Sequence, residues 1–159
     1  MFSSALAQSD TANWPSQNLN IENSRYSTLD QINTSNVDQL NILWSFEPGL
    51  RDDIAQVTPL VVDGVMYLHS RATMYALDAT TGEELWRRIL DSGPANGPVR
   101  GSTYAEGRVY AYRGADLYAF DAETGAAVAS FGDAGFLKVV AQGLHHQYPD
   151  TYPTDIDPI

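Results

Sequence analysis

One sequence pattern occurs twice in the chain, and this repeat constrains the fold more than any other feature. The stretch YALDATTGEELW begins at Tyr75, and YAFDAETGAAVA begins at Tyr118, which is a shift of 43 residues. The same shift places DGVMY on EGRVY, and no gap is needed between the two matches. A period of about 40–45 residues, with short strands between turn residues, is typical of the blades of a β-propeller.

Each copy predicts the same order of strands and turns. Asp63-Gly64 and Glu106-Gly107 are two-residue hairpin signals between β-rich runs. The next strand, TMYALDA or DLYAFDA, ends in a D-x-x-T-G turn, where Asp and Thr accept backbone N–H bonds and Gly supplies a positive φ. A last strand follows. The sequence therefore predicts an all-β fold: a partial β-propeller of about two four-stranded antiparallel blades, with short helical turns.

Trp86 closes the first copy, whereas Ala129 stands at the matching position of the second. A buried indole N–H needs a hydrogen-bond partner. We expect Trp86 to lie across the next blade and donate to its backbone; the alternative is an ordinary core tryptophan. Phe131 is expected on the same strand face as Ala129, and it is the candidate to close the second seam.

The flanking segments complete the domain division. LNILWSFEP, around Trp44, has no repeat unit before it and is interpreted as the outer strand of a blade begun elsewhere. NTSNVDQL predicts a short helical turn capped by Ser35 or Asn36. Residues 13–136 are assigned to the partial propeller, and residues 137–159 to a loop or short helix in a truncated C-terminal tail. Two blades fall below the four that a closed propeller needs, so the chain either associates with other copies or is a piece of a longer protein.

Residues 1–12 are assigned to a flexible N-terminus. The triplet Ala5-Leu6-Ala7 is either the cleavage end of a secretory signal peptide or a chance match. The first interpretation predicts a periplasmic or secreted protein.

Composition excludes several classes of function. The formal net charge is −11, from 20 acidic and 9 basic side chains, so a nucleic acid or an anionic membrane surface would be repelled. The absence of cysteine excludes disulfides and thiolate metal sites. No apolar run approaches the roughly 18 residues of a membrane span, so no transmembrane segment is expected.

The repeat and its flanks resemble the N-terminal part of the quinoprotein alcohol dehydrogenases, which use pyrroloquinoline quinone (PQQ). Their tryptophan-docking motif, A-x-D-x-x-T-G-x-x-x-W, is matched fully from Ala76 to Trp86, and from Ala119 to Gly125 up to the missing tryptophan. NSRYSTLDQINTSNVDQL is similar to the segment ahead of the first blade, and VRGSTYAEGRVYA to the start of the next. The resemblance implies an eight-bladed propeller, of which this chain supplies about the first two blades.

The resemblance also implies the chemistry. Family members oxidise alcohols or sugars with PQQ near the propeller axis, beside a calcium or lanthanide ion. By position, Gln56 and Arg100 are the implied cofactor contacts, although Gln56 stands where the family commonly has a carboxylate. A guanidinium suits the carboxylates of PQQ; the alternative for Arg100 is a surface arginine. Metal ligands and the catalytic aspartate belong to later blades, and His145-His146 is interpreted as a loop pair.

Three functions remain open at this stage. The first is a part of a PQQ-dependent dehydrogenase, inactive as an isolated chain, whose partners are the remaining propeller blades and a small alcohol or sugar substrate. The second is a non-enzymatic propeller-repeat scaffold that binds other proteins. The third is a short form in which several copies close one ring.

Overall fold

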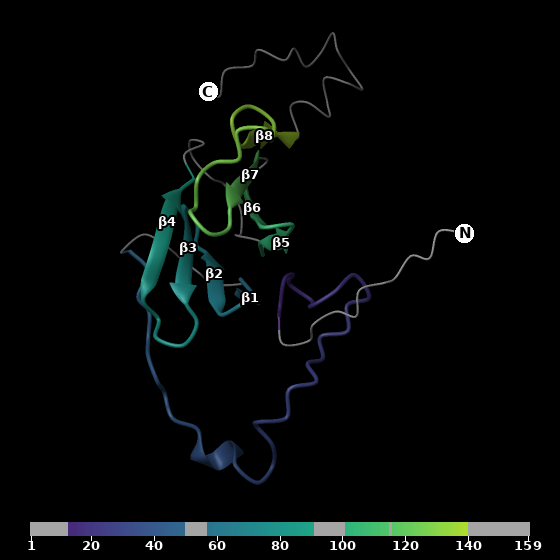
Figure 1. Cartoon of the computed structure of the whole chain (residues 1–159), viewed down its shortest axis with the longest axis vertical. Coiled ribbons are helices and arrows are strands. Elements are labelled where there is room, and N and C mark those ends of the chain that lie inside the picture. Colours follow the sequence, from purple (N-terminus) through teal and green to yellow (C-terminus); the bar gives the residue numbers. More distant parts are fainter. Residues whose placement is uncertain (1–12, 50–56, 91–100, 115, 140–159) are drawn as a thin grey trace, which may run out of the picture.

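Two four-stranded antiparallel sheets lie beside each other, and a long N-terminal segment loops away from them and returns (Figure 1). The computed structural model describes residues 13–49, 57–90, 101–114 and 116–139. The first sheet contains β1 (Leu60–Val62), β2 (Val65–His69), β3 (Thr73–Asp78) and β4 (Glu84–Ile89), in that order. The second contains β5 (Thr103–Ala105), β6 (Arg108–Arg113), β7 (Asp116–Asp121) and β8 (Phe136–Lys138). The all-β prediction of two four-stranded antiparallel sheets is confirmed.

Turn chemistry explains why both sheets begin with a tight hairpin. Asp63 and Gly64 have φ values of 50° and 81°, and Glu106 and Gly107 have 51° and 73°. Two successive positive φ angles define the type I′ turn, whose twist matches that of the flanking strands. β1 therefore pairs with β2, and β5 with β6, in matching registers across the two copies.

The D-x-x-T-G turns are held by their aspartates. Asp78 accepts hydrogen bonds from the backbone N–H groups of Thr80 and Thr81, both at 2.8 Å. Asp121 accepts from the hydroxyl of Thr124 at 2.7 Å and from its N–H at 2.8 Å. These bonds, from Thr81 above all in the first turn and from the Thr124 side chain in the second, lower the pKa of both carboxyl groups. Their stabilising effect is present above about pH 4 and is lost as the pH falls through the lowered folded-state pKa.

The main hydrophobic core lies between the two sheets. Leu60, Met74 and Val109 are fully buried in it, together with Tyr67 and Trp86. A smaller cluster covers the other face of the first sheet, where Leu68, Tyr75 and Leu77 meet side chains of the N-terminal segment. The adjacent blades predicted from the repeat are therefore packed face to face through alternating strand positions.

The fourth strand of the second sheet is not where the repeat placed it. Directly after the turn, Ala127 makes a single bridge to Phe120, and β8 begins only at Phe136. The intervening residues 128–135 form a loop with positive φ at Gly132, Ala134 and Gly135. A Cβ on Gly135 would lie 2.8 Å from the Cβ of Ala127, so the end of the loop packs tightly against its beginning.

Phe131 consequently lies in this loop and not on a strand face, which corrects the prediction. Its ring packs edge-to-face on Tyr110, with centroids 5.6 Å apart. Trp86 packs on the equivalent Tyr67 at 6.0 Å. Phe131 thus makes the matching ring contact within its own sheet, while its role at a further seam stays a prediction.

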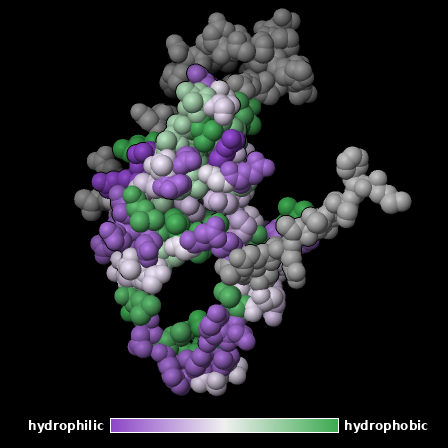
Figure 2. Space-filling model, in the orientation of Figure 1, coloured by the Kyte–Doolittle hydropathy of each residue, from purple (hydrophilic) through white to green (hydrophobic). Residues whose placement is uncertain are grey.

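The predicted helical turn is confirmed as a short 3-10 helix, η1 (Val37–Gln39). Asn36 is the N-cap residue, but its side chain makes no capping bond and instead accepts from the N–H of Asn33. Ile42 and Leu43 in the same segment are 89% and 86% exposed, so hydrophobic side chains remain on its surface (Figure 2). Within the described residues, no helix is long and apolar enough to cross a membrane.

Candidate functional site

Trp86 forms the seam between the two sheets. Its indole Nε1–H donates to the carbonyl of Ala122, in the turn of the second sheet, at 2.9 Å. The ring lies flat on Gly125, where a Cβ would come within 2.7 Å of Trp86 Cδ2. The predicted inter-blade role of Trp86 is confirmed, and the structure explains why the turn carries glycine at this position.

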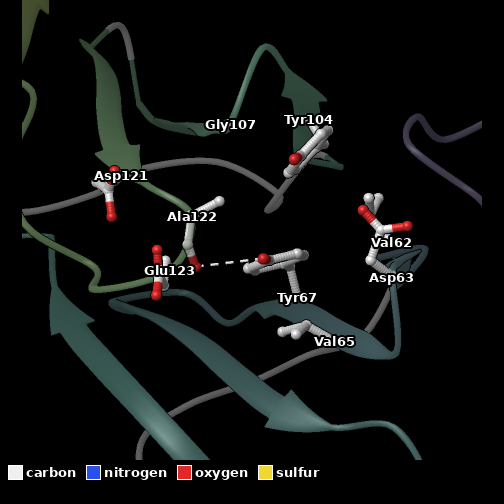
Figure 3. A pocket seen from close by; sticks show the side chains of 9 residues that line it. All are labelled: Val62, Asp63, Val65, Tyr67, Tyr104, Gly107, Asp121, Ala122 and Glu123. Carbon is white, nitrogen blue, oxygen red and sulfur yellow. Dashed lines mark hydrogen bonds between the residues drawn. The ribbon is translucent and has the colours of Figure 1, made fainter.

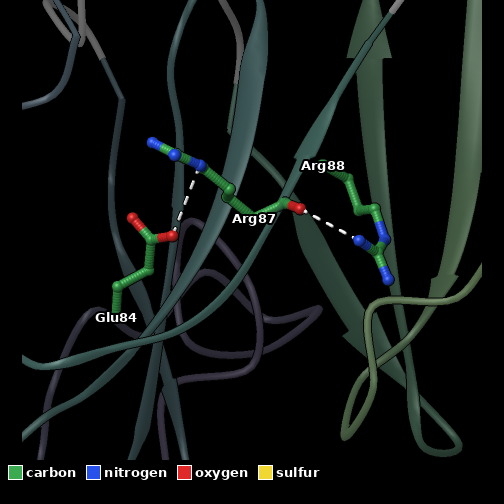
Figure 4. A network of polar contacts seen from close by, with 3 residues as sticks. All are labelled: Glu84, Arg87 and Arg88. Atoms are coloured by element: carbon green, nitrogen blue, oxygen red, sulfur yellow. Dashed lines mark hydrogen bonds and ion pairs between the residues drawn. The ribbon is translucent and has the colours of Figure 1, made fainter.

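Two further side chains cross the same seam, and sequence reasoning did not find either role. The Tyr67 hydroxyl donates to the Ala122 carbonyl at 3.2 Å, so one carbonyl oxygen accepts two bonds from the first sheet. Arg88 donates through Nε to the carbonyl of Gly125 at 2.6 Å. Arg87, the neighbouring residue on β4, instead pairs with Glu84 at 3.4 Å (Figure 4). The recurrence of tyrosine at positions 67 and 110 of the repeat was the available signal for Tyr67.

Trp44 makes with the turn of the first sheet the same contact that Trp86 makes with the turn of the second. Its Nε1–H donates to the carbonyl of Ala79 at 3.2 Å, and a Cβ on Gly82 would lie 2.6 Å from Trp44 Cδ2. Ala79 and Gly82 occupy the same positions in the first turn as Ala122 and Gly125 in the second. Trp44 therefore docks on the first sheet as Trp86 docks on the second. Residues 40–49 form no strand in the structure, so the predicted outer strand around Trp44 is not observed.

A cleft of about 440 Å³ opens beside the seam, at the end where the hairpin turns lie. Tyr67 and Tyr104 line its middle, and Val62 lies among its apolar residues (Figure 3). The carboxylate of Asp63 lies at one end of the cleft, and those of Asp121 and Glu123 lie at the other. Burial, and then the neighbouring Tyr104, Asp63 and Asp121, raise the pKa of Tyr67 to about 12.

The wild-type protein should lose stability at alkaline pH because Tyr67 has a raised pKa, and replacing Tyr67 by phenylalanine should remove this loss. The tyrosine pKa is about 10 in the unfolded chain and about 12 in the folded one. Below pH 10 both states keep the proton; between about pH 10 and 12 the unfolded state loses it first, so the free energy of unfolding falls as pH rises. Urea unfolding from about pH 8 to 12 measures this fall.

Tyr112 provides the matched control, because its side chain is 44% exposed. Tyr112→Phe should keep the alkaline loss that Tyr67→Phe removes. Identical pH profiles for wild type and Tyr67→Phe would contradict the assignment.

The first strands of the two sheets, β1 and β5, start at the same end, opposite the cleft. Residues 14–16 bridge both sheets, since Trp14 pairs antiparallel with Val61 of β1 and Ser16 pairs antiparallel with Thr103 of β5. Two strands that are antiparallel to one segment are parallel to each other, so β1 and β5 start at the same end. The residues that lead into them, 57–59 and 101–102, therefore also lie at this end, away from the cleft.

Comparison with known proteins decides the family. The family model described as "Glucose/ethanol/alcohol dehydrogenase, beta-propeller domain", labelled PQQ, matches residues 14–159. The chain belongs to the PQQ-dependent dehydrogenase propeller family.

Individual members of the PQQ family agree with this assignment. The dehydrogenase subunit of the quinone alcohol dehydrogenase of Gluconobacter oxydans is 38% identical over 135 residues, which are 76% of this chain and 18% of that protein. The solved quinohemoprotein alcohol dehydrogenase ADHIIG of Pseudomonas putida is 35% identical with a TM-score of 0.66, over 72% of this chain and 18% of that one. A europium-containing methanol dehydrogenase structure is 34% identical with a TM-score of 0.62, over 71% and 22%. The chain thus spans about a fifth of its relatives' length and corresponds to an N-terminal portion of them.

The two residues implied as cofactor contacts, Gln56 and Arg100, lie outside the described residues, as does His145-His146. The described strands place residues 57–59 and 101–102, which lead into β1 and β5, at one end of the two neighbouring sheets, and the roles of Gln56 and Arg100 stay predictions. At this end Gly101 also lies against Gln17, whose Cβ would be 3.4 Å from a Cβ on the glycine. No group of three potential metal-ligating side chains occurs among the described residues.

Proposed function

We propose that this chain is part of a PQQ-dependent dehydrogenase that oxidises alcohols or sugars, and that it contributes one side of the quinone site. The observation that supports the proposal is the parallel start of β1 and β5, which belong to the two neighbouring sheets. Gln56 precedes β1 and Arg100 precedes β5. We therefore propose that both residues contribute to the same site, one from each sheet.

The two side chains supply binding and orientation. The guanidinium of Arg100 would pair with a carboxylate of PQQ through two parallel hydrogen bonds. The amide of Gln56 would hydrogen-bond a carboxylate or carbonyl oxygen of PQQ without adding a negative charge beside it. When bound, PQQ accepts the hydride equivalent from the substrate.

The rest of the site lies in other parts of the enzyme. We assign the calcium or lanthanide ligands and the catalytic base to further blades, since the chain spans about a fifth of its relatives. The 159-residue chain alone should therefore hold PQQ weakly and show no turnover. We also propose a periplasmic or secreted location, which the Ala5-Leu6-Ala7 triplet supports.

Replacing Arg100 by leucine should weaken PQQ binding by roughly ten- to a hundredfold, because a charge-assisted hydrogen bond contributes about 1.5–3 kcal/mol. Equilibrium dialysis of the chain against PQQ, with calcium chloride present, measures the affinity. Dye reduction with ethanol or glucose, tested in parallel, should be absent for both proteins.

Arg108→Leu is the matched control, because Arg108 begins β6 at the turn end, away from the proposed site. Its PQQ affinity should equal that of the wild type. If Arg100→Leu and Arg108→Leu bind PQQ alike, the role of Arg100 is wrong. Sustained dye reduction by the chain alone would refute the claim that catalysis needs further blades.

A further inference from the structure

The cleft beside the seam lies at the hairpin-turn end of the strands, away from the residues proposed to hold the quinone. It therefore requires an explanation of its own. We propose that this cleft binds a small organic cation, with an ammonium group held against the tyrosines and between the carboxylates. The inference does not depend on the proposed dehydrogenase function.

The walls of the cleft suit an organic group. Its volume of about 440 Å³ lies in the range of small-molecule sites, roughly 300–1,000 Å³. Tyr67 and Tyr104 have ring centroids 6.0 Å apart and planes inclined at 33°. Tyr67 is 4% exposed and Tyr104 is partly exposed, so Tyr104 is the ring that a ligand can reach. Aromatic faces attract ammonium groups through the ring quadrupole.

The position of Tyr67 is fixed by the fold, which makes this wall of the cleft rigid. Its hydroxyl is held by the carbonyl of Ala122, and only 4% of the residue is exposed. Tyr104 is partly exposed, and its backbone N–H is held by the carbonyl of Pro15 at 2.7 Å. The backbone of Tyr104 and the ring of Tyr67 behind it are therefore held in place before a ligand binds, which lowers the entropy lost on binding.

The acidic side chains that line the cleft favour a ligand with a positive charge. Asp63 lies at one end, and Asp121 and Glu123 lie at the other (Figure 3). All residues that line the cleft are acidic, aromatic or aliphatic, apart from the glycine at position 107, and none is basic. Asp63 and Asp121 accept hydrogen bonds from Asn13 and Thr124, and Arg108 lies opposite Asp121 on β6. The lining itself still carries a net negative charge, which favours a cation.

The spacing of the carboxylates favours an organic cation over a metal ion as the ligand. Calcium takes six to eight oxygen ligands at about 2.3–2.6 Å. Among the described residues, no three acidic or histidine side chains come close enough together to hold a metal. Carboxylates spread around an aromatic wall instead match a larger cation whose charge is distributed over methyl or methylene groups.

Tetramethylammonium chloride is the probe, because it has the required charge and no hydroxyl group that a dehydrogenase could oxidise. We expect isothermal titration calorimetry of the full chain at low ionic strength to show saturable binding. Sodium chloride at equal ionic strength should give no saturable heat. Calcium chloride should not displace the probe at equal concentration.

Two variants test the two parts of the cleft. Tyr104→Leu keeps an apolar side chain but removes an aromatic face, and it should weaken binding about three- to thirtyfold. Glu123→Gln removes one exposed charge and should weaken binding about threefold. Glu106→Gln is the matched control, because Glu106 is exposed in a hairpin turn and does not line the cleft; its affinity should equal that of wild type.

The outcomes decide the proposal even if Tyr104→Leu folds poorly, since Glu123 is exposed and its replacement keeps the shape of the turn. Equal affinities for Glu123→Gln and Glu106→Gln would overturn it. So would an absence of saturable heat at millimolar tetramethylammonium, or tighter binding of calcium than of the probe. None of these results bears on PQQ binding, which we propose at the other end of the strands.

Discussion

Replacing Trp86 by alanine should lower the free energy of unfolding by about 3–5 kcal/mol, which is the usual cost of truncating a buried tryptophan to alanine. The residue is 8% exposed and belongs to the core between the sheets. Its loss would also remove one of the two bonds that reach the Ala122 carbonyl. Urea unfolding followed by circular dichroism measures the change.

Trp86→Phe separates packing from hydrogen bonding. Phenylalanine keeps an aromatic ring against Gly125 but loses the N–H, while Tyr67 still donates to the Ala122 carbonyl. We expect a loss of about 1–2 kcal/mol for this variant. Leu85→Ala, at a position 51% exposed on the same strand, should change stability by about 0.5 kcal/mol or less. If Trp86→Ala costs no more than Leu85→Ala, the seam does not stabilise the fold as described.

The parts of the fold that sequence reasoning predicted are those with local causes. Asp63-Gly64 specifies its own turn, because Gly and Asp tolerate positive φ at little cost. Glu106-Gly107 forms the same turn, in which Gly107 supplies one of the two positive φ angles without strain. The D-x-x-T-G turns are likewise closed by side chains within the motif. Local signals of this kind survive in the folded protein because the packing agrees with them.

The parts that were missed depend on what lies across a seam. Arg88 is one of two adjacent arginines, and only the position of the second sheet makes it, and not Arg87, a donor to the Gly125 carbonyl. The late start of β8 has a local signal, since Gly132 and Gly135 interrupt the expected strand. The repeat, which favoured continuing the strand after Gly125, outweighed that signal.

The candidate quinone site was reached by a different route. Gln56 and Arg100 came from a family resemblance, because neither residue type nor spacing alone points to a quinone. The structure adds the parallel start of β1 and β5, which follows from the pairing of residues 14–16 with both strands. No sequence pattern predicted this pairing, since it joins segments far apart in the chain.

Two glycines in turns of the second sheet make the second large prediction. Gly125 and Gly107 have similar φ values, 67° and 73°. A Cβ on Gly107 would meet nothing within 4 Å, whereas a Cβ on Gly125 would lie 2.7 Å from Trp86 Cδ2. Gly107→Ala therefore carries only the backbone cost of a positive φ, about 1–2 kcal/mol, while Gly125→Ala adds the cost of forcing the indole off its place, about 1–3 kcal/mol.

We therefore expect Gly125→Ala to lower the free energy of unfolding by about 2–5 kcal/mol. This loss should be larger than that of Gly107→Ala by the cost of displacing the indole, about 1–3 kcal/mol. The difference should vanish in a Trp86→Ala background, because the atom that clashes is then absent, and a double-mutant cycle measures this coupling. Tryptophan fluorescence gives an independent reading, since a displaced Trp86 gains solvent. Equal losses for the two glycine variants would show that the indole yields freely, and the seam would then be held by the Tyr67 and Arg88 bonds to the second turn.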